Sequence, residues 1–179
     1  AAEGKAVGRS LCENDLIPSA RNILAKAKSL GREIVLPVDV VVAQKLAAFA
    51  PSRVTQVDEV APDDMIFDIG PRSIEHVVSV LARVKTLVWN GPFGAFEIEP
   101  FDNGTIEVAE AAAELTVTGK LVSFAGGGDT VAALNKAGVT GRLTHVSTAG
   151  GAFLESLEGR TLPGVEVLKV TSTSAAPLT

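Results

Sequence analysis

Hydrophobic residues along this chain follow two spacings, one typical of strands and one typical of helices. Short runs rich in β-branched and other apolar residues predict strands at 33–36, 65–69, 86–89, 120–125 and 144–147. Between most of them, apolar residues recur every three or four positions, which predicts helices. This alternation is typical of a mostly parallel sheet with helices on its faces.

The boundaries of the first two helices are predicted from capping and terminating residues. Asn14 or Asp15 can cap the first, with Pro18 tolerated in its first turn and Gly31 ending it. Its expected apolar face consists of Leu16, Ala20, Ile23, Leu24 and Ala27. Ser73 is expected to cap the second helix, with an apolar face of Ile74, Val77, Val78, Leu81 and Ala82.

Three further helices are expected at about 104–115, 129–137 and 153–157. No internal repeat and no long linker divides the chain. We therefore predict one α/β domain over residues 1–170, with Rossmann-like three-layer αβα architecture, followed by a polar tail of small residues at 171–179 that is expected to fray.

Composition narrows the class of protein. Of the 179 residues, 46% are hydrophobic and 21% are charged, which is the balance of a soluble globular protein, and no apolar run is long enough to span a membrane. The start of the chain lacks the layout of a signal peptide, and a single cysteine, Cys12, cannot form an internal disulfide, so we expect a cytoplasmic protein. One cysteine and two histidines are too few for a zinc site.

The net charge of −5 argues against a nucleic-acid partner, which requires a basic face. The same negative net charge is unusual for a protein that binds a negatively charged triphosphate with its own residues alone. In a parallel sheet, ligands bind at the carboxyl ends of the strands. Three of the predicted strands are each followed by a glycine-containing segment of unusual composition.

The first such segment is Trp89–Glu97, with the sequence WNGPFGAFE. Two glycines and a proline make a tight loop that could hold Asn90 and Glu97 beside a ribose or a phosphate. The alternative is a rigid turn that packs Trp89, Phe93 and Phe96 into the core. Composition alone does not decide between the two.

The second segment is Ser123–Thr130, with the sequence SFAGGGDT, running from a strand into a helix. Its glycines allow close approach of a bound group to free N–H groups at the helix start, which favour an anion. Asp129 could hold Mg²⁺ on a nucleotide phosphate. The alternative is that Asp129 or Thr130 only stabilises the first helical turn. The segment matches neither GxxxxGK[ST] nor GxGxxG, so a dinucleotide-dependent dehydrogenase is poorly supported.

The third segment, His145–Ala152, repeats the order of strand, glycines and helix. Two anion-binding helix starts at one sheet edge indicate a polyphosphate or a transferred phosphoryl group between them. A catalytic role for His145 is not favoured, because a strand histidine beside valine is more often packed or hydrogen-bonded. None of the lysines lies within the three segments, although phosphoryl transfer normally requires cations.

Several motifs, in their order, closely resemble the phosphoglycerate kinase family over nearly the whole chain. They are LPVDVVVA (36–43), DIGP (68–71), VWNGPFGAFE (88–97), GGGDT (126–130), HVSTAGGAFLE (145–155) and LEGRTLPGVEVL (157–168). The family exchanges a phosphoryl group between 1,3-bisphosphoglycerate and MgADP, giving 3-phosphoglycerate and MgATP. The resemblance implies that this chain is the nucleotide-binding C-terminal part of such a kinase, a phosphotransferase of glycolysis and gluconeogenesis.

The resemblance also implies residue roles. Leu46 and Phe67 would flank the adenine, and Asp129 would ligate Mg²⁺. The ribose and phosphate side would be lined by Asn90, Pro92, Gly94, Ala95 and Glu97, with Gly127, Gly128 and Thr130 around the phosphates. Gly150 and Gly151 would offer backbone N–H groups to the transferred phosphoryl group.

The sequence departs from the family pattern in two ways. Ala149 stands where the family has a glycine, which would cost about 1 kcal/mol if that position needs a positive φ. The family's N-terminal domain, the lysine-containing nucleotide loop and the linking helix are also absent, so the resemblance assigns the cations to segments that this sequence lacks. We therefore expect a domain truncated at its N-terminal side, with 3-phosphoglycerate bound only through the missing domain and the full enzyme monomeric.

An alternative is a catalytically inactive nucleotide-binding or structural fragment. Missing strands would then leave an open sheet edge that favours self-association. Size-exclusion chromatography over a range of concentrations separates these hypotheses, because an exposed edge predicts an elution volume that depends on concentration.

Overall fold

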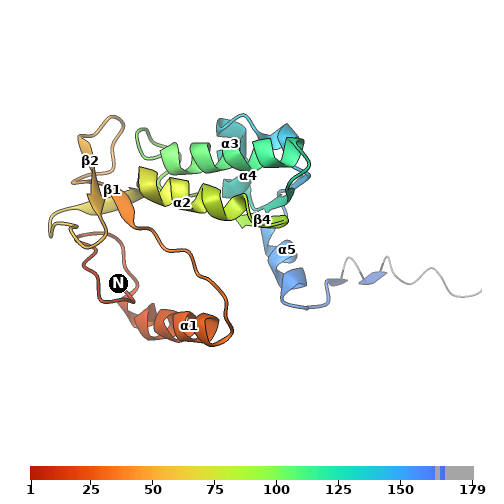
Figure 1. Ribbon diagram of the computed structural model, residues 1–179, viewed down its shortest axis with the longest axis horizontal. Helices are drawn as coiled ribbons and strands as arrows, with labels where there is room; N and C mark the ends of the chain where they lie inside the picture. Colours follow the sequence, from red (N-terminus) through yellow and green to blue (C-terminus); the bar gives the residue numbers. More distant parts are fainter. Residues whose placement is uncertain (164–165, 168–179) are drawn as a thin grey trace, which may run out of the picture.

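The computed structural model describes residues 1–163 and 166–167 and contains two three-stranded sheets (Figure 1). One sheet is parallel, with the order β4-β5-β6, formed by β4 (Thr86–Asn90), β5 (Val122–Gly126) and β6 (His145–Ser147). The other is antiparallel, with the order β2-β1-β3, formed by β1 (Asp39–Ala43), β2 (Ser52–Gln56) and β3 (Met65–Ile69).

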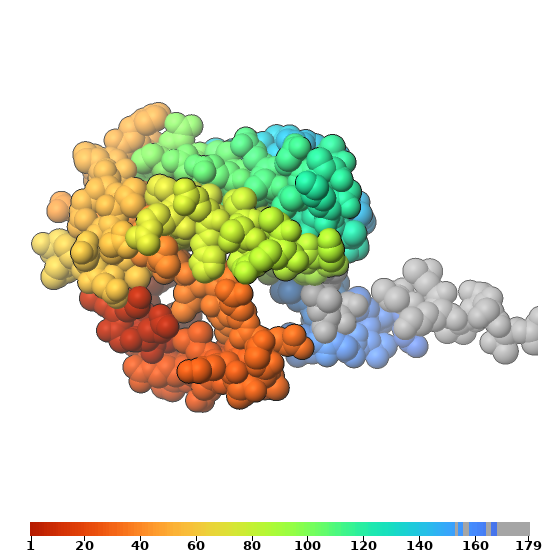
Figure 2. Space-filling model, in the orientation of Figure 1, coloured from red at the N-terminus to blue at the C-terminus, as the bar shows by residue number. Residues whose placement is uncertain are grey.

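The parallel sheet confirms the predicted α/β architecture. Helix α2 (Pro71–Leu81) leads into β4, α3 (Asn103–Val117) crosses from β4 to β5, and α4 (Gly128–Lys136) with the short 3₁₀ helix η2 (Thr140–Arg142) crosses from β5 to β6. Helix α5 (Gly150–Leu157) follows β6. These bounds lie within three residues of the predicted ones. Helices α2 and α3 pack side by side (Figure 2).

The main hydrophobic core lies between the parallel sheet and these helices. It includes Trp89 on β4, Ala125 on β5, Leu134 on α4, and the face of α3 that carries Val108, Ala109, Ala112 and Ala113. The small residues of α3 let that helix approach the sheet closely. The alanine-rich sequence of α3 therefore serves both helix formation and packing.

The antiparallel sheet was not predicted, because β1 and β2 were not recognised as strands. Strand β1 is a run of apolar residues, with Val40, Val42 and Ala43 buried. The connections from β1 to β2 and from β2 to β3 contain no helix. A parallel pair needs a long crossover, usually helical, whereas short connections suffice for antiparallel strands. The absence of helical spacing between residues 44 and 64 is therefore the sequence feature that could have indicated antiparallel strands.

The predicted strand at 33–36 is wrong, because these residues have no regular structure. A strand requires a neighbour for its backbone N–H and C=O groups, and no strand in the described part of the chain pairs with this run. Val35, Leu36 and Pro37 instead line a small cavity with Ile69 and Phe93.

The start of the first helix also differs from the prediction. A 3₁₀ turn, η1 (Asn14–Leu16), precedes α1 (Ile17–Ser29), whose N-cap is Leu16, so neither Asn14 nor Asp15 caps it. Pro18 occupies the first turn, and Gly31, with φ of +61°, follows its end as expected. No residue of α1 is buried, and Ile23 is 60% exposed. Ala20, Ile23 and Leu24 of the predicted apolar face line a cavity together with Ile34 and Leu36, so the face is only partly covered. The helix protrudes below α2 in Figure 1.

Ser73 does not cap α2, which begins at Pro71 with Gly70 as its N-cap. The carboxylate of Asp39, on β1, instead accepts the N–H groups of Arg72 (3.1 Å) and Ser73 (2.8 Å). Burial raises the pKa of Asp39, but hydrogen bonds from Ser73 and Arg72 outweigh that effect and lower the pKa below its ordinary value. A strand residue thus caps the helix and joins the antiparallel sheet to α2.

The predicted tail at 171–179 lies outside the described residues, as does part of the last motif. Within the described part of the chain, no helix is both long enough and apolar enough to cross a bilayer.

Candidate functional site

Three glycine-containing loops leave the parallel sheet at the same level. The strand register aligns Asn90 of β4 with Gly126 of β5, and Gly126 with Ser147 of β6. All three loops therefore begin at the carboxyl edge of the sheet, where helix starts and loops converge in open α/β folds.

The first and second loops are tied together. The backbone N–H of Gly91 donates to the hydroxyl of Thr130 over 2.7 Å, and Thr130 is only 1% exposed. A Cβ placed on Gly127 would lie 3.1 Å from Oδ1 of Asn90. Thr130 therefore joins the two loops through its side chain, and Asn90 lies directly against the glycine segment.

The second and third loops are in backbone contact. The N–H of Gly127, whose φ is +108°, donates to the carbonyl of Ser147 over 3.1 Å. A Cβ on Gly150 would collide with the backbone of Gly127, so this position requires glycine. Ala149 does not have a positive φ, and its N–H donates to the Ser147 hydroxyl. The strain considered for Ala149 therefore does not arise.

Two helices begin at this edge, and the N–H of Gly150 at the start of α5 already donates to the Thr148 carbonyl over 3.0 Å. Helix α4 starts at Gly128 with Gly127 as its N-cap and no side-chain cap, and α5 starts at Gly150. Gly128 and Gly151 are exposed. The first N–H groups of a helix lack partners within the helix, and the helix dipole favours an anion there. The edge can therefore bind phosphate-like groups.

Asp129 offers a carboxylate in the first turn of α4. It is exposed and makes no hydrogen bond or ion pair in the described part of the chain. No group of three or more His, Cys, Asp or Glu residues that could hold a metal ion occurs among the described residues. A single free carboxylate beside a phosphate site fits Mg²⁺, which usually takes one or two protein carboxylates and completes its shell with phosphates and water.

A cavity of about 370 Å³ lies beside the first loop. Phe67, Gly94 and Ala95 line it, together with Pro37 and Val40. The N–H of Ala95 donates to the Phe67 carbonyl over 2.8 Å, which joins the loop to β3. Phe67, Gly94 and Ala95, three of the residues predicted from the sequence to contact the nucleotide, therefore lie together at this cavity.

The remaining candidates are placed more openly. Leu46 is 47% exposed and does not line the cavity. Glu97 is exposed at the end of the first loop, and Pro92 is half-buried within it. The packing alternative holds for part of the same loop, since Trp89 is buried and its ring lies 6.0 Å from that of Phe93.

Asp68 supports the first loop from beneath and was not singled out from the sequence. It is 2% exposed, and its carboxylate accepts the N–H groups of Ile69 and Gly104, both over 2.8 Å. A Cβ on Gly94 or Gly104 would collide with it, so both glycines permit its approach. Burial raises the pKa of Asp68 to about 6, with a further contribution from the negative charges of Asp102 and Glu107.

Lys136 is the second residue that sequence reasoning missed. Its Nζ donates to the carbonyl of Phe96 over 2.8 Å and lies 2.8 Å from a carboxylate oxygen of Asp102, which is 4% exposed. Lys136, at the end of α4, thus holds both the first loop and Asp102, the residue that precedes α3. No local pattern reveals this contact, because Lys136 and Phe96 are 40 residues apart.

The fold and the edge define an α/β protein with glycine loops and helix starts gathered at the carboxyl end of a parallel sheet. The family model described as phosphoglycerate kinase matches residues 1–160. This chain therefore belongs to the phosphoglycerate kinase family.

Individual relatives agree with that assignment. The chain is 60% identical over 169 residues to a phosphoglycerate kinase of Xanthobacter autotrophicus, covering 94% of this chain and 43% of that protein. A phosphoglycerate kinase of Agrobacterium fabrum is 54% identical, with coverage of 94% and 42%. The solved structure of phosphoglycerate kinase from Coxiella burnetii superposes with a TM-score of 0.87 at 43% identity, covering 94% of this chain and 42% of that one. The chain thus spans about two fifths of the length of these relatives.

Proposed function

We propose that this chain carries the MgADP/MgATP side of the phosphoglycerate kinase reaction, as the C-terminal, nucleotide-binding part of the enzyme. In that reaction a phosphoryl group passes from 1,3-bisphosphoglycerate to ADP, giving 3-phosphoglycerate and ATP. The observation that carries the proposal is the convergence of two helix starts, at Gly128 and Gly150, on one sheet edge.

The proposed nucleotide orientation follows the distribution of apolar and polar groups. The adenine lies toward the cavity lined by Phe67, Gly94 and Ala95, where flat apolar groups are favoured. Asn90 and Glu97 face the ribose from the first loop. This arrangement leaves Leu46, which does not line the cavity, with at most a peripheral contact.

The phosphates lie at the start of α4, where Gly127 and Gly128 let the backbone approach them closely. The backbone N–H of Gly151 faces the transferred phosphoryl group, whereas the N–H of Gly150 donates to the Thr148 carbonyl over 3.0 Å. Thr130 keeps the first loop in register with the second. Mg²⁺, held by Asp129 and the nucleotide phosphates, would supply positive charge against the developing negative charge of the reaction.

We also propose that the chain does not turn over alone. Phosphoryl transfer depends on positioning and on cations around the transferred group. Lys136 is the lysine that contacts the first loop, and it is already paired with Asp102. A coupled assay of ATP formation from 1,3-bisphosphoglycerate and MgADP is expected to give no turnover above background, and protein-dependent turnover contradicts this part of the proposal.

Isothermal titration of MgADP tests the nucleotide site directly. We expect saturable binding that weakens about tenfold or more in Asp129→Ala, because the metal loses its protein ligand. Asp63→Ala is the matched control, since Asp63 is also exposed but lies outside the three loops. Absence of binding by protein that circular dichroism shows to be folded, or equal binding by both variants, contradicts the proposed site.

A further inference from the structure

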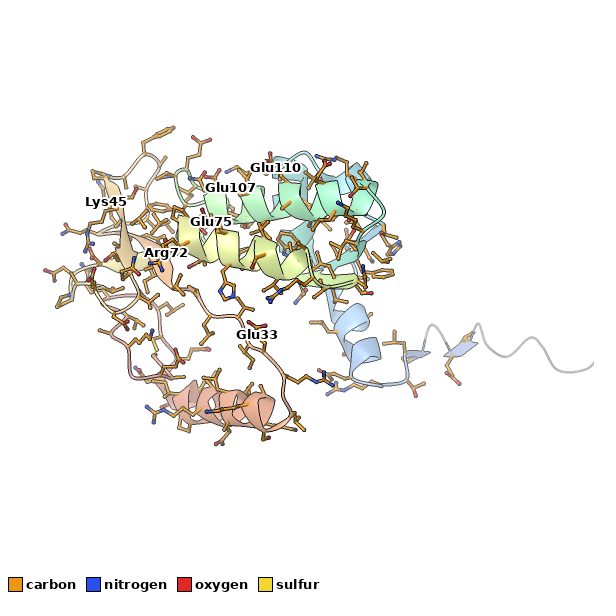
Figure 3. All side chains as sticks on the ribbon, in the orientation of Figure 1. Glu33, Lys45, Arg72, Glu75, Glu107 and Glu110 are labelled. Atoms are coloured by element: carbon orange, nitrogen blue, oxygen red, sulfur yellow. The ribbon has the colours of Figure 1, made fainter. Side chains whose placement is uncertain are left out.

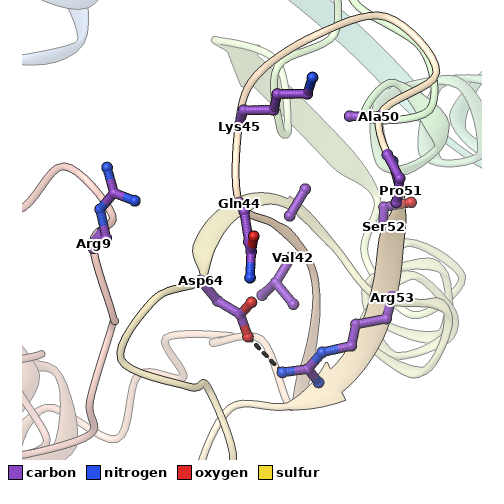
Figure 4. A pocket seen from close by; sticks show the side chains of 10 residues that line it. Arg9, Val42, Gln44, Lys45, Ala50, Pro51, Ser52, Arg53 and Asp64 are labelled. Carbon is purple, nitrogen blue, oxygen red and sulfur yellow. Dashed lines mark hydrogen bonds and ion pairs between the residues drawn. The ribbon is translucent and has the colours of Figure 1, made fainter.

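A second cavity, of about 690 Å³, lies beside the antiparallel sheet and shares no lining residue with the glycine loops. Its floor is apolar, formed by Val42, Ala43 and Ala50, which are at most 6% exposed. Its rim carries Arg9, Lys45 and Arg53, which come from three separate segments of the chain (Figure 4).

Two of the three cations have no anionic partner. Within the described residues, neither Arg9 nor Lys45 makes an ion pair or a side-chain hydrogen bond. Arg53 is paired with the carboxylate of Asp64, which is 7% exposed and also accepts the N–H of Ala61. The pair holds Arg53 in place, while the other two charges remain available to a ligand.

The segment that presents Arg9 is fixed by backbone contacts. The N–H of Arg9 donates to the carbonyl of Asp64 over 2.7 Å, and the hydroxyl of Ser10 accepts the N–H of Ile66 over 2.8 Å. A Cβ on Gly8, whose φ is +57°, would collide with the carbonyls of Ala61 and Asp64. Asp64 therefore anchors two of the cations, one through its carbonyl and one through its carboxylate. The backbone of the Arg9 segment is thus ordered before a ligand binds, and binding costs mainly the rotamer freedom of the exposed Arg9 and Lys45 side chains.

Charge is also unevenly distributed along the chain. Residues 1–60 contain eight Lys and Arg against seven Asp and Glu, whereas residues 61–179 contain eight against fourteen. Figure 3 shows Glu75 on α2 and Glu107 and Glu110 on α3, and Lys45 to their left, near β1 and β2. The charged residues that line the cavity are three cations and one carboxylate, so the cavity is positively charged in a chain of net charge −5 and attracts anions.

We propose that this cavity binds a small organic anion that carries two or more phosphate or carboxylate groups. Arg9 and Lys45 contact the anionic groups, and the Val42, Ala43 and Ala50 floor accommodates the carbon skeleton. Arginine suits a planar, bidentate contact with either kind of group, and lysine adds a point charge. This site shares no lining residue with the cavity proposed above for the nucleotide.

Isothermal titration without magnesium tests the site, using inorganic pyrophosphate in one arm and citrate in the other. We expect saturable binding of at least one probe, weakened about tenfold by Arg9→Ala and by Lys45→Ala, as for a lost charge-assisted hydrogen bond. The tighter probe identifies phosphate or carboxylate as the preferred group. Lys120→Ala, which removes an exposed lysine elsewhere, is expected to change nothing.

Gly8→Ala is a further variant that removes no charge. By displacing the Arg9 segment it is expected to weaken binding, an effect that non-specific attraction to a positive surface does not produce. If Gly8→Ala fails to fold, the titrations of the Arg9 and Lys45 variants test the proposal without it. Absence of saturable binding by either probe, unchanged binding in both alanine variants, or equal weakening by Lys120→Ala overturns the proposal. Titration with MgADP is expected to be the same for the Arg9 and Lys45 variants as for the unmodified chain, which separates this site from the nucleotide site.

Discussion

The two sheets of this molecule contain the same number of strands but are packed very differently. The parallel sheet is covered by α2, α3 and α4 and shares one continuous core with them. The antiparallel sheet has two small buried clusters, around Val40 and Val42 and around Phe101, and the neighbouring α1 buries none of its residues. Stability in a domain depends on contiguous apolar burial, so the parallel half is expected to be the more stable unit.

The difference extends to the two candidate sites. At the parallel sheet, the loops are held by contacts with buried groups such as Thr130 and Asp68, and the proposed binding groups are backbone N–H groups. At the antiparallel sheet, the proposed binding groups are the side chains of Arg9 and Lys45. A site built from backbone depends on how accurately the fold is held, whereas a site built from exposed side chains depends mainly on charge.

The largest effect is expected from removing core volume in the parallel half. Leu134→Ala is expected to lower the free energy of unfolding by about 3–4 kcal/mol, because Leu134 is 0% exposed in the main core. Ile23→Ala on α1 is the matched truncation in the other half and is expected to cost less than about 0.5 kcal/mol. Urea denaturation followed by circular dichroism measures both. Similar losses in the two variants would show that α1 is packed as firmly as the core.

The pH dependence of stability is expected to reveal Asp68, which joins the two halves. Its pKa is raised to about 6 in the folded state, against an ordinary value of 3.8. Between these pH values the folded state retains a proton that the unfolded state has lost, so stability falls as pH rises from about 4 to about 7. The expected loss is about 2–3 kcal/mol.

Asp68→Asn is expected to remove that part of the pH dependence while leaving the rest of the profile. Asp39 has a lowered pKa in the folded state and therefore adds a slope of opposite sign near the acid end of this range, but both proteins contain it, so it cancels in their difference. Urea titrations at half-unit intervals of pH measure the difference between the two proteins. Parallel profiles would mean that Asp68 has an ordinary pKa and that its burial beneath Gly94 and Gly104 is incomplete.

The same division between halves separates what the sequence predicted from what it did not. Helices α2, α3 and α4 and the parallel strands follow from local spacing and from glycines at strand ends, because each element is stabilised next to its sequence neighbours. The strand predicted at 33–36 failed because strand formation depends on a partner, which spacing does not report. Strands β1 and β2 were missed because their continuous or weakly patterned sequences do not distinguish strand from loop.

The candidate site divides in the same way. Glycines mark the three loops in the sequence, and the structure brings Asn90, Gly127 and Gly150 together. The supporting residues were not predictable, because Lys136 reaches Phe96 across 40 residues and Asp68 reaches Gly104 across 36. Such contacts depend on tertiary packing, and a lone lysine or aspartate carries no local signal for them.

A smaller effect is expected from breaking the contact that fixes the first loop. Lys136→Ala leaves the buried Asp102 carboxylate without its cation and removes a donor from Phe96, which is expected to cost about 1–2 kcal/mol of stability. The loop is also expected to loosen, so MgADP binding weakens several-fold. Lys120→Ala is the matched control for removal of an exposed lysine. If Lys136→Ala matches that control in both stability and MgADP titration, the contact does not organise the site.

The smallest effect is expected in the antiparallel half, at the connection between β1 and β2. Phe49 has φ of +55° although its side chain is 79% exposed, a backbone conformation that is unfavourable for a bulky residue. Its N–H donates to the Glu99 carbonyl over 2.9 Å, which holds the connection in that conformation. Phe49→Asn keeps this backbone bond and tolerates the positive φ, so it is expected to stabilise the protein by about 0.5–1 kcal/mol in urea denaturation. Phe49→Val, which keeps an apolar side chain but is β-branched, is expected to destabilise it. Destabilisation by Asn and Val alike would mean that the phenyl ring contributes more than its exposure suggests, and the antiparallel half would then be more firmly packed than its small clusters imply.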